Sequence, residues 1–312
     1  MRVAAPARTL PHLSPAKLAR LRQLFRVVRF ISPALASRLA LDFFMRPSRR
    51  QLDDVDAPTL AAARLRRLDF EGRALQLYEW GPDAAAAPRS VLLLHGWGSH
   101  APRWTSFIEG IVARGWRAVA FDAPAHGRSE GSRSSLWQFR GALDRVIEEA
   151  GPFDAIVAHS LGALALTQRL GEVVSPAPRA AVLASLPPDL GYLLDSFLQL
   201  LGGDEAFAAR VHARFTARFG RPAAGFDSLS LAPQITTPLL LLHDRDDDIT
   251  PVAHAERITP LLPHAALFLT QGFGHSGLLR DPAAVGAALG FLEGTLGPVP
   301  VRHARVTDPL AH

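Results

Sequence analysis

Cysteine is absent from this chain of 312 residues, and Lys17 is its only lysine. The absence of cysteine excludes disulfide bonds, a thiolate nucleophile and cysteine-ligated zinc. The sequence also lacks the run of about 18 apolar residues that a membrane-spanning helix needs. Apolar stretches near the N-terminus are interrupted by Arg20, Arg22, Arg26 and Arg29, where a secretory signal would have an unbroken apolar segment. These absences predict a cytoplasmic protein.

Charge is distributed unevenly along the chain, whose formal net charge is +5. Residues 1–50 contain 11 basic residues and a single acidic residue, Asp42. The remaining 23 basic and 28 acidic residues make the rest of the chain mildly acidic, which argues against nucleic acid as a partner. Two interpretations of the basic segment stay open. Its helices dock on the acidic body, or they lie on an anionic membrane surface and make the protein peripherally membrane-associated.

The chain is predicted to divide into a basic helical extension over residues 1–64 and a larger α/β domain over residues 65–312. Apolar residues at helical steps predict one or two helices within residues 14–46, with a break at Pro33. Residues 47–64 are polar and contain proline, which is typical of a linker.

Strands and helices are predicted to alternate through the larger domain. Arg67–Phe70 and Leu75–Glu79 flank a turn and predict an antiparallel hairpin. Further strands are predicted at residues 91–94, 117–121, 153–158, 180–184, 238–242 and 266–270, each followed by helical sequence. Short, continuously apolar strands are typical of a parallel sheet covered by helices on both faces. The predicted fold class is therefore α/β, with a doubly wound, mostly parallel sheet and a site at the carboxyl ends of its strands.

One insertion interrupts this alternation at about residues 188–232. Asp204 is placed to cap a helix that runs to about Phe219. One side of that helix carries an apolar stripe (Phe207, Val211, Phe215 and Phe219), and another carries Arg210, Arg214 and Arg218. An amphipathic insertion at the carboxyl edge of a sheet is expected to form a small helical lid over the site.

The most informative short motif is Ala158-His159-Ser160-Leu161-Gly162, between a predicted strand and a predicted helix. A serine on such a bend presents its hydroxyl at the edge of the sheet, and small residues on either side let strand and helix approach closely. The motif predicts that Ser160 is a nucleophile. The alternative is that Ser160 only caps the helix.

Two further residues follow the last two predicted strands. Asp247 comes after the strand at 238–242, and His275 comes after the strand at 266–270. Neutral serine is a poor nucleophile, so His275 is expected to take its proton while Asp247 orients the imidazole. Asp247 is preferred as the acid, and its neighbours Asp244, Asp246 and Asp248 stay open as alternatives.

The reaction also needs donors for a developing oxyanion. The backbone N–H of Leu161, at the start of the helix, is one candidate, and the N–H of Trp97 in His95-Gly96-Trp97-Gly98 is the other. Several aromatic residues are candidates for the substrate pocket, with ordinary core packing as the alternative: Trp104, Trp137, Phe207 and Phe215. No metal or other cofactor is expected, because the histidines show no metal-binding spacing. His95 and His126 are expected to be buried loop residues.

Taken together, these motifs resemble those of α/β-hydrolase-fold serine hydrolases. The matching segments are His95–Gly98, Asp122–Ser129, the Ser160 motif, Asp247 with Pro251, and Gly274-His275. The set is similar to that of carboxylesterases, cofactor-free haloperoxidases and the methyl ester esterase that acts on pimeloyl-carrier protein. The motifs depart from the family in having Ala158 and Asp244 where glycine is frequent.

The resemblance implies an enzyme that cleaves esters, thioesters or amides. The predicted reaction is hydrolysis of a carboxylic ester through an acyl-serine intermediate, with a small-molecule acyl ester as substrate. An acyltransferase with the same three residues and a non-catalytic ligand receptor on this fold are the alternatives. An acidic carrier protein, held by the arginines at 210, 214 and 218, is an alternative partner.

Overall fold

The computed structural model describes residues 15–49, 53–172 and 175–298. Eight strands form one sheet in the order β1-β2-β4-β3-β5-β6-β7-β8. The strands are β1 (Arg64–Phe70), β2 (Arg73–Trp80), β3 (Ser90–Leu94), β4 (Arg117–Phe121), β5 (Ala155–His159), β6 (Ala180–Ala184), β7 (Leu239–Asp244) and β8 (Ala265–Thr270). Strands β1 and β2 form the predicted antiparallel hairpin, β2 pairs antiparallel with β4, and the remaining neighbours are parallel. The predicted α/β fold with a mostly parallel sheet is confirmed.

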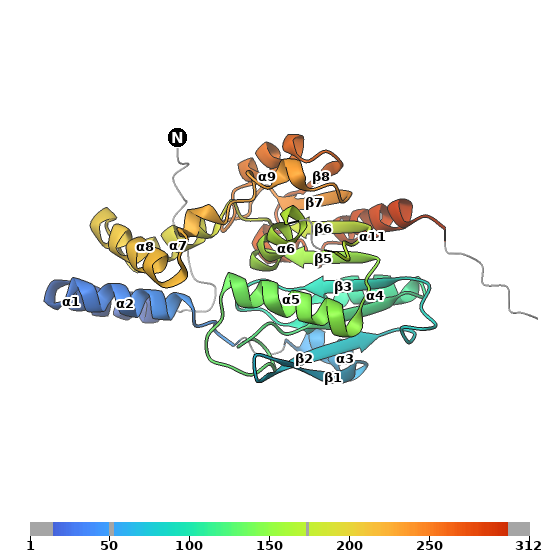
Figure 1. Cartoon of the computed structure of the whole chain (residues 1–312), viewed down its shortest axis with the longest axis horizontal. Coiled ribbons are helices and arrows are strands. Elements are labelled where there is room, and N and C mark those ends of the chain that lie inside the picture. Colours follow the sequence, from blue (N-terminus) through green and yellow to red (C-terminus); the bar gives the residue numbers. More distant parts are fainter. Residues whose placement is uncertain (1–14, 50–52, 173–174, 299–312) are drawn as a thin grey trace, which may run out of the picture.

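Helices cover both faces of this sheet (Figure 1). The helices after the sheet strands are α4 (Thr105–Ala113), α5 (Leu136–Ala150), α6 (Leu161–Gly171), α9 (Val252–Ile258), α10 (Gly274–Gly277) and α11 (Pro282–Leu296). Helices α5, α6 and α9 contribute to one hydrophobic core, and α4 and α11 to the core on the other face. The inner strands are buried along their whole length, because helices cover them from both sides.

The insertion after β6 contains two helices, α7 (Leu190–Leu200) and α8 (Glu205–Phe219). As predicted, Asp204 caps α8, since its carboxylate accepts a hydrogen bond from the N–H of Phe207 at 2.8 Å. Phe207, Val211 and Phe215 form the buried side of the helix.

The N-terminal segment forms helices α1 (Pro15–Ile31) and α2 (Pro33–Phe44), separated at Ser32, whose backbone is extended. A short helix α3 (Ala57–Ala61) precedes β1. Figure 1 shows α1, α2, α7 and α8 together at one end of the molecule. Arg22 and Arg29 donate hydrogen bonds to the carbonyls of Leu200 and Gly202 at 2.8 Å each. The N-terminal helices therefore pack on this insertion, which we call the lid insertion after its predicted role. Docking on the rest of the chain was one of the two interpretations that the sequence left open, and the insertion is the part that receives the helices.

Candidate active site

The nucleophile candidate lies on a sharp turn between β5 and α6. Ser160 has φ of 53° and ψ of −120°, a conformation that costs a residue with a side chain on the order of 1–3 kcal/mol. A Cβ atom at Gly162 would come within 2.5 Å of the His95 carbonyl oxygen, so only glycine fits two residues after the serine. Ala158, two residues before it, is fully buried, which shows that a methyl group is accommodated there. The turn thus holds Ser160 at the carboxyl end of the sheet in one fixed orientation.

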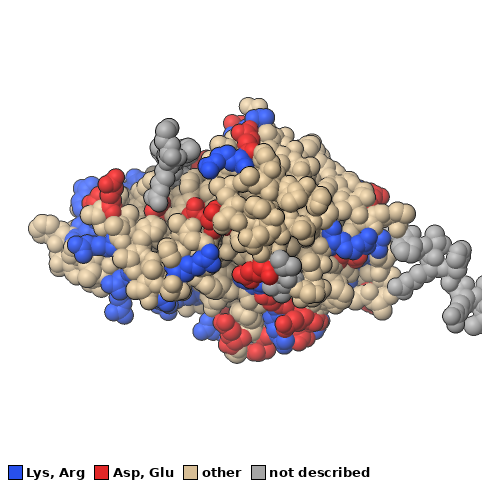
Figure 2. Space-filling view, turned by 45° about the horizontal axis from the view of Figure 1, so that its top comes forward, with Lys and Arg blue, Asp and Glu red and all other residues tan. Residues whose placement is uncertain are grey.

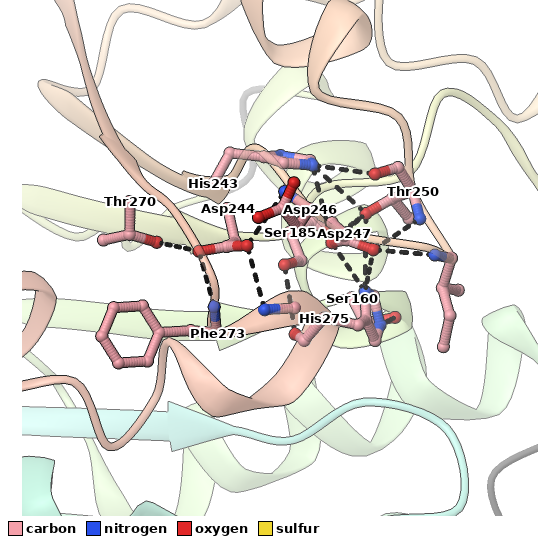
Figure 3. A network of polar contacts seen from close by, with 12 residues as sticks. Ser160, Ser185, His243, Asp244, Asp246, Asp247, Thr250, Thr270, Phe273 and His275 are labelled. Atoms are coloured by element: carbon pink, nitrogen blue, oxygen red, sulfur yellow. Dashed lines mark hydrogen bonds and ion pairs between the residues drawn. The ribbon is translucent and has the colours of Figure 1, made fainter.

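His275 lies between Ser160 and Asp247, within hydrogen-bonding distance of both (Figure 3). The Nε2 atom of His275 lies 2.9 Å from the Ser160 Oγ atom. On the other side of the ring, Nδ1 lies 2.9 Å and 3.0 Å from the two carboxylate oxygens of Asp247. This arrangement lets the imidazole accept the serine proton while the carboxylate faces the developing positive charge.

Asp247 is held as a carboxylate at this position. Burial by itself raises its pKa, but the charge of His275 and hydrogen bonds from His275 and Thr250 outweigh burial and hold the pKa of Asp247 well below its ordinary value. The bonds from Thr250 come from its N–H at 2.8 Å and its hydroxyl at 2.7 Å, and the N–H of Ile249 donates a third at 2.9 Å. A carboxylate that accepts this many hydrogen bonds has few orientations open to it, and here it faces the ring of His275.

The other aspartates of this loop have different partners. Asp244 accepts hydrogen bonds from the N–H groups of Phe273 and Gly274 and from the Thr270 hydroxyl, at 2.6–3.2 Å. It therefore joins the end of β7 to the loop that carries His275. The Asp246 carboxylate accepts a hydrogen bond from the N–H of Gly272, and Asp248 is exposed. The geometry supports Asp247 as the acid, and its role stays a prediction.

Two residues that the sequence did not single out for this purpose position the backbone of His275. The ring of His159 lies with Nε2 2.8 Å from the His275 carbonyl oxygen, and the Ser185 hydroxyl donates to the same oxygen at 3.2 Å. Burial, with the charge of His275, lowers the pKa of His159 to about 3. His159 is therefore neutral at physiological pH and donates its Nε2 hydrogen to this carbonyl. His159 directly precedes Ser160 in the sequence, so its position in the motif was a signal that could have identified it.

The loop after β3 lies against the nucleophile. A Cβ atom at Gly96 would come within 2.9 Å of the Ser160 Cβ atom, so the loop that contains Trp97 approaches the serine closely. Leu161 is the first residue of α6, where backbone N–H groups have no partner within the helix. The loop after β3 and the start of α6 therefore both lie beside Ser160. The N–H groups of Trp97 and Leu161 stay the predicted oxyanion donors.

The buried histidines near the site fit the expected structural role. His95 and His126 are almost completely buried, and the Nε2 atom of His95 accepts a hydrogen bond from the N–H of Ala123 at 3.0 Å. Burial lowers the pKa of His95 to about 4 and that of His126 well below its ordinary value, so both are neutral. Within residues 15–49, 53–172 and 175–298, no group of three or more histidine, aspartate or glutamate side chains is arranged to hold a metal ion.

The aromatic pocket candidates belong to two different hydrophobic cores. Trp104 is fully buried beside Phe107, in the core on the α4 and α11 side of the sheet, and so offers no surface to a substrate. The burial of Trp104 contradicts its interpretation as a pocket residue and fits the alternative of ordinary core packing, because an aromatic residue type alone does not tell a pocket from a core. Trp137 packs on Phe215 of the lid insertion, and Phe207 packs on Phe25 of α1. These three residues join helices to one another.

A different group of aromatic residues lies at the loop after β3, which approaches Ser160. Phe44, the last residue of α2, stacks on Trp97 with ring centroids 6.4 Å apart. Phe197 of α7 packs on Phe44 with centroids 5.4 Å apart. The sequence did not identify Phe44 or Phe197 as pocket candidates. Phe44 lies in the N-terminal extension, and Phe197 precedes the helix whose apolar stripe contains Phe207 and Phe215.

The fold, the strand-end position of the three polar residues and the chain's similarities agree on one class of protein. Residues 91–288 match the model of the alpha/beta hydrolase family, so the chain belongs to this family and is a hydrolase.

Particular relatives carry different activities in their names. The chain is similar to a 2-hydroxy-6-oxononadienedioate/2-hydroxy-6-oxononatrienedioate hydrolase of Cupriavidus pinatubonensis, with 28% identity over 62% of this chain and 82% of the relative. It is also similar to a pimeloyl-[acyl-carrier protein] methyl ester esterase of Nitrosomonas europaea, with 27% identity over 65% of this chain and 92% of the relative.

Among solved structures, an esterase of Pyrococcus furiosus superposes with a TM-score of 0.60 and 19% identity, over 81% of this chain and 98% of the esterase. This likeness shows the shared fold.

Among the described residues, none of the helices has the length and apolar character of a membrane span.

Proposed function

We propose that this hydrolase cleaves a carboxylic ester through an acyl-enzyme formed on Ser160. The observation that carries the proposal is the chain of contacts from the Ser160 Oγ atom to His275 Nε2 at 2.9 Å, and from His275 Nδ1 to Asp247 at 2.9 Å. It is supported by relatives named as hydrolases and esterases.

In the first half of the reaction, the Ser160 oxygen attacks the carbonyl carbon of the ester while His275 Nε2 accepts the serine proton. The carbonyl oxygen becomes an oxyanion, which the N–H groups of Trp97 and Leu161 are proposed to stabilise, at roughly 3–4 kcal/mol for one donor. The bond to the leaving oxygen then breaks as His275 returns its proton to that oxygen, and the alcohol departs. In the second half, His275 takes a proton from water, the hydroxide attacks the acyl carbon, and Ser160 leaves with the proton restored.

The acyl group is proposed to be apolar. Phe44, Trp97 and Phe197 form an aromatic group directly beside the loop that approaches Ser160. An apolar acyl chain placed against these rings would bury its surface at about 25 cal/mol per Å². Small-molecule esters are the proposed substrates, and methyl esters belong in any screen because one relative is named as a methyl ester esterase.

The test is hydrolysis of a series of p-nitrophenyl esters together with labelling by a fluorophosphonate. We expect Ser160→Ala to abolish both, whereas Ser230→Ala, at an exposed serine on the lid insertion, retains both. Retained activity in Ser160→Ala would refute the proposal. Product analysis with added alcohols or amines separates hydrolysis from acyl transfer, and a folded protein that no fluorophosphonate labels would instead indicate a ligand receptor.

A further inference from the structure

Helices α1 and α2 expose a group of large apolar side chains to solvent. At the end of α1, Phe30 is 92% exposed and Ile31 is 74% exposed. We call the exposed set the apolar patch, and its members are Leu24, Val27, Phe30, Ile31, Leu35 and Leu39. Single exposed apolar residues are ordinary on a protein surface, but six within consecutive turns of two helices are unusual and suggest a partner for this surface.

Arginines surround this patch. Arg20, Arg26 and Arg38 are exposed on the same two helices. None of these three guanidinium groups forms an ion pair with another residue in the described part of the chain, so their charges face solvent. By contrast, the one acidic residue of these helices, Asp42, is neutralised by Arg46 at 2.9 Å and by Arg133 at 2.6 Å.

A groove between α2 and α8 adds further charge beside the patch. Its volume is about 1000 Å³. Leu35, Leu39 and Arg38 line it from α2, and Arg210, Arg214 and Arg218 line it from α8. The arginine stripe of the lid insertion therefore faces the same solvent region as part of the apolar patch.

The patch lies on helices at one end of the described structure. In Figure 1 the helices α1, α2, α7 and α8 project from the sheet and its covering helices. Figure 2 shows mostly basic side chains around this end, whereas acidic side chains gather on the lower middle of the visible face. On this face, basic side chains therefore outnumber acidic ones around the end that carries these helices.

We propose that the apolar patch and its arginines dock the protein on a membrane surface that contains anionic phospholipid. Phe30 and Ile31 enter the boundary between headgroups and acyl chains, and the unpaired arginines bind lipid phosphates. An acidic carrier protein would bind the arginines through its charge. It would not provide an apolar environment for side chains as exposed as Phe30. A membrane uses both features, and the inference does not depend on the proposed esterase activity.

The test is co-sedimentation of the full chain carrying Ser160→Ala with lipid vesicles, which keeps binding separate from turnover. We expect binding to vesicles of equal parts phosphatidylglycerol and phosphatidylcholine, and much weaker binding to phosphatidylcholine alone. Raising salt from ~0.1 M to ~1 M shortens the screening length from about 10 Å to about 3 Å and should release much of the bound protein.

Two variant sets separate the apolar and the electrostatic contributions. Phe30→Ser with Ile31→Ser should weaken binding at least about tenfold, since two large side chains lose their apolar environment. Arg20→Gln, Arg26→Gln and Arg38→Gln combined should weaken it about 100-fold, at about fivefold per arginine near an anionic surface. All five positions are exposed, so folding should be unaffected.

Matched control variants lie on the β1–β2 hairpin, where Leu65 is 52% exposed and Arg67 and Arg73 are exposed. Leu65→Ser and Arg67→Gln with Arg73→Gln should leave vesicle binding unchanged. The proposal is overturned if the full chain fails to bind anionic vesicles, or if the patch variants bind as well as the controls do. It is also overturned if an acidic carrier protein binds and loses affinity only in the arginine variant.

Discussion

Replacing Asp247 by asparagine tests the site most directly, because the change keeps the shape of the side chain and removes its charge. In the structure this carboxylate accepts hydrogen bonds from His275 Nδ1, from the N–H groups of Ile249 and Thr250, and from the Thr250 hydroxyl. An asparagine offers one oxygen and an NH2 group. With its oxygen kept on the two backbone donors, the NH2 group faces the imidazole and favours the tautomer that cannot take the serine proton.

The expected loss follows from that tautomer change. In a serine protease triad the same substitution lowers kcat about 10⁴-fold, which corresponds to about 5.5 kcal/mol of transition-state stabilisation. We expect a loss of the same order here, measured as kcat at neutral pH on a p-nitrophenyl ester. Asp248→Asn is the matched control, since Asp248 is exposed in the same loop, and it should change kcat less than about twofold.

Asp244→Asn separates a positioning role from the proposed direct one. Asp244 accepts hydrogen bonds from Phe273, Gly274 and Thr270. Weakening these bonds should loosen the loop of His275 and lower the free energy of unfolding. It should also lower kcat, but by less than Asp247→Asn does. If Asp247→Asn retains most of the activity while Asp244→Asn or Asp248→Asn abolishes it, the assignment of the acid is wrong.

The remaining predictions concern stability and the acyl site. Gly162→Ala should destabilise the fold by several kcal/mol in urea unfolding, because its Cβ would lie 2.5 Å from a carbonyl oxygen, whereas Gly290→Ala, with open space in α11, should stabilise it by about 0.5–1 kcal/mol. Buried His95 and His159 have pKa values lowered to about 4 and about 3, so between these values and about 6.5 the unfolded chain binds more protons than the folded chain. Stability should therefore fall as pH is lowered from 7 to 5, by on the order of 1 kcal/mol per pH unit for each histidine, and equal unfolding midpoints at the two pH values would contradict this. Phe44→Ala should raise KM for long-chain p-nitrophenyl esters more than for the acetate, and an equal change for both would remove Phe44 from the acyl site.

Local sequence patterns determined the sheet and the position of the three polar residues. Continuous apolar strands such as β7 must be buried on both faces, and strand–helix alternation then brings the carboxyl ends of the strands to one edge. The turn at Ser160 could also be predicted, because a close approach of strand and helix requires a residue as small as Gly162. Because Ser160, Asp247 and His275 each follow a strand whose carboxyl end lies at this edge, their positions along the chain already implied proximity in space.

The tertiary structure alone decided which aspartate faces His275, which aromatic rings lie near the serine, and what covers the N-terminal helices. The sequence favoured Asp247 but left Asp244, Asp246 and Asp248 open. Only the loop's hydrogen bonds to Thr250 and to the N–H groups after β8 give Asp244, Asp246 and Asp247 different partners. Likewise, helical periodicity predicts that one side of a helix is buried, but the partner of that side depends on contacts between residues distant in sequence, such as Phe44 and Phe197. Local patterns encode which surfaces must leave water, whereas the choice of partner depends on the packing of the whole chain.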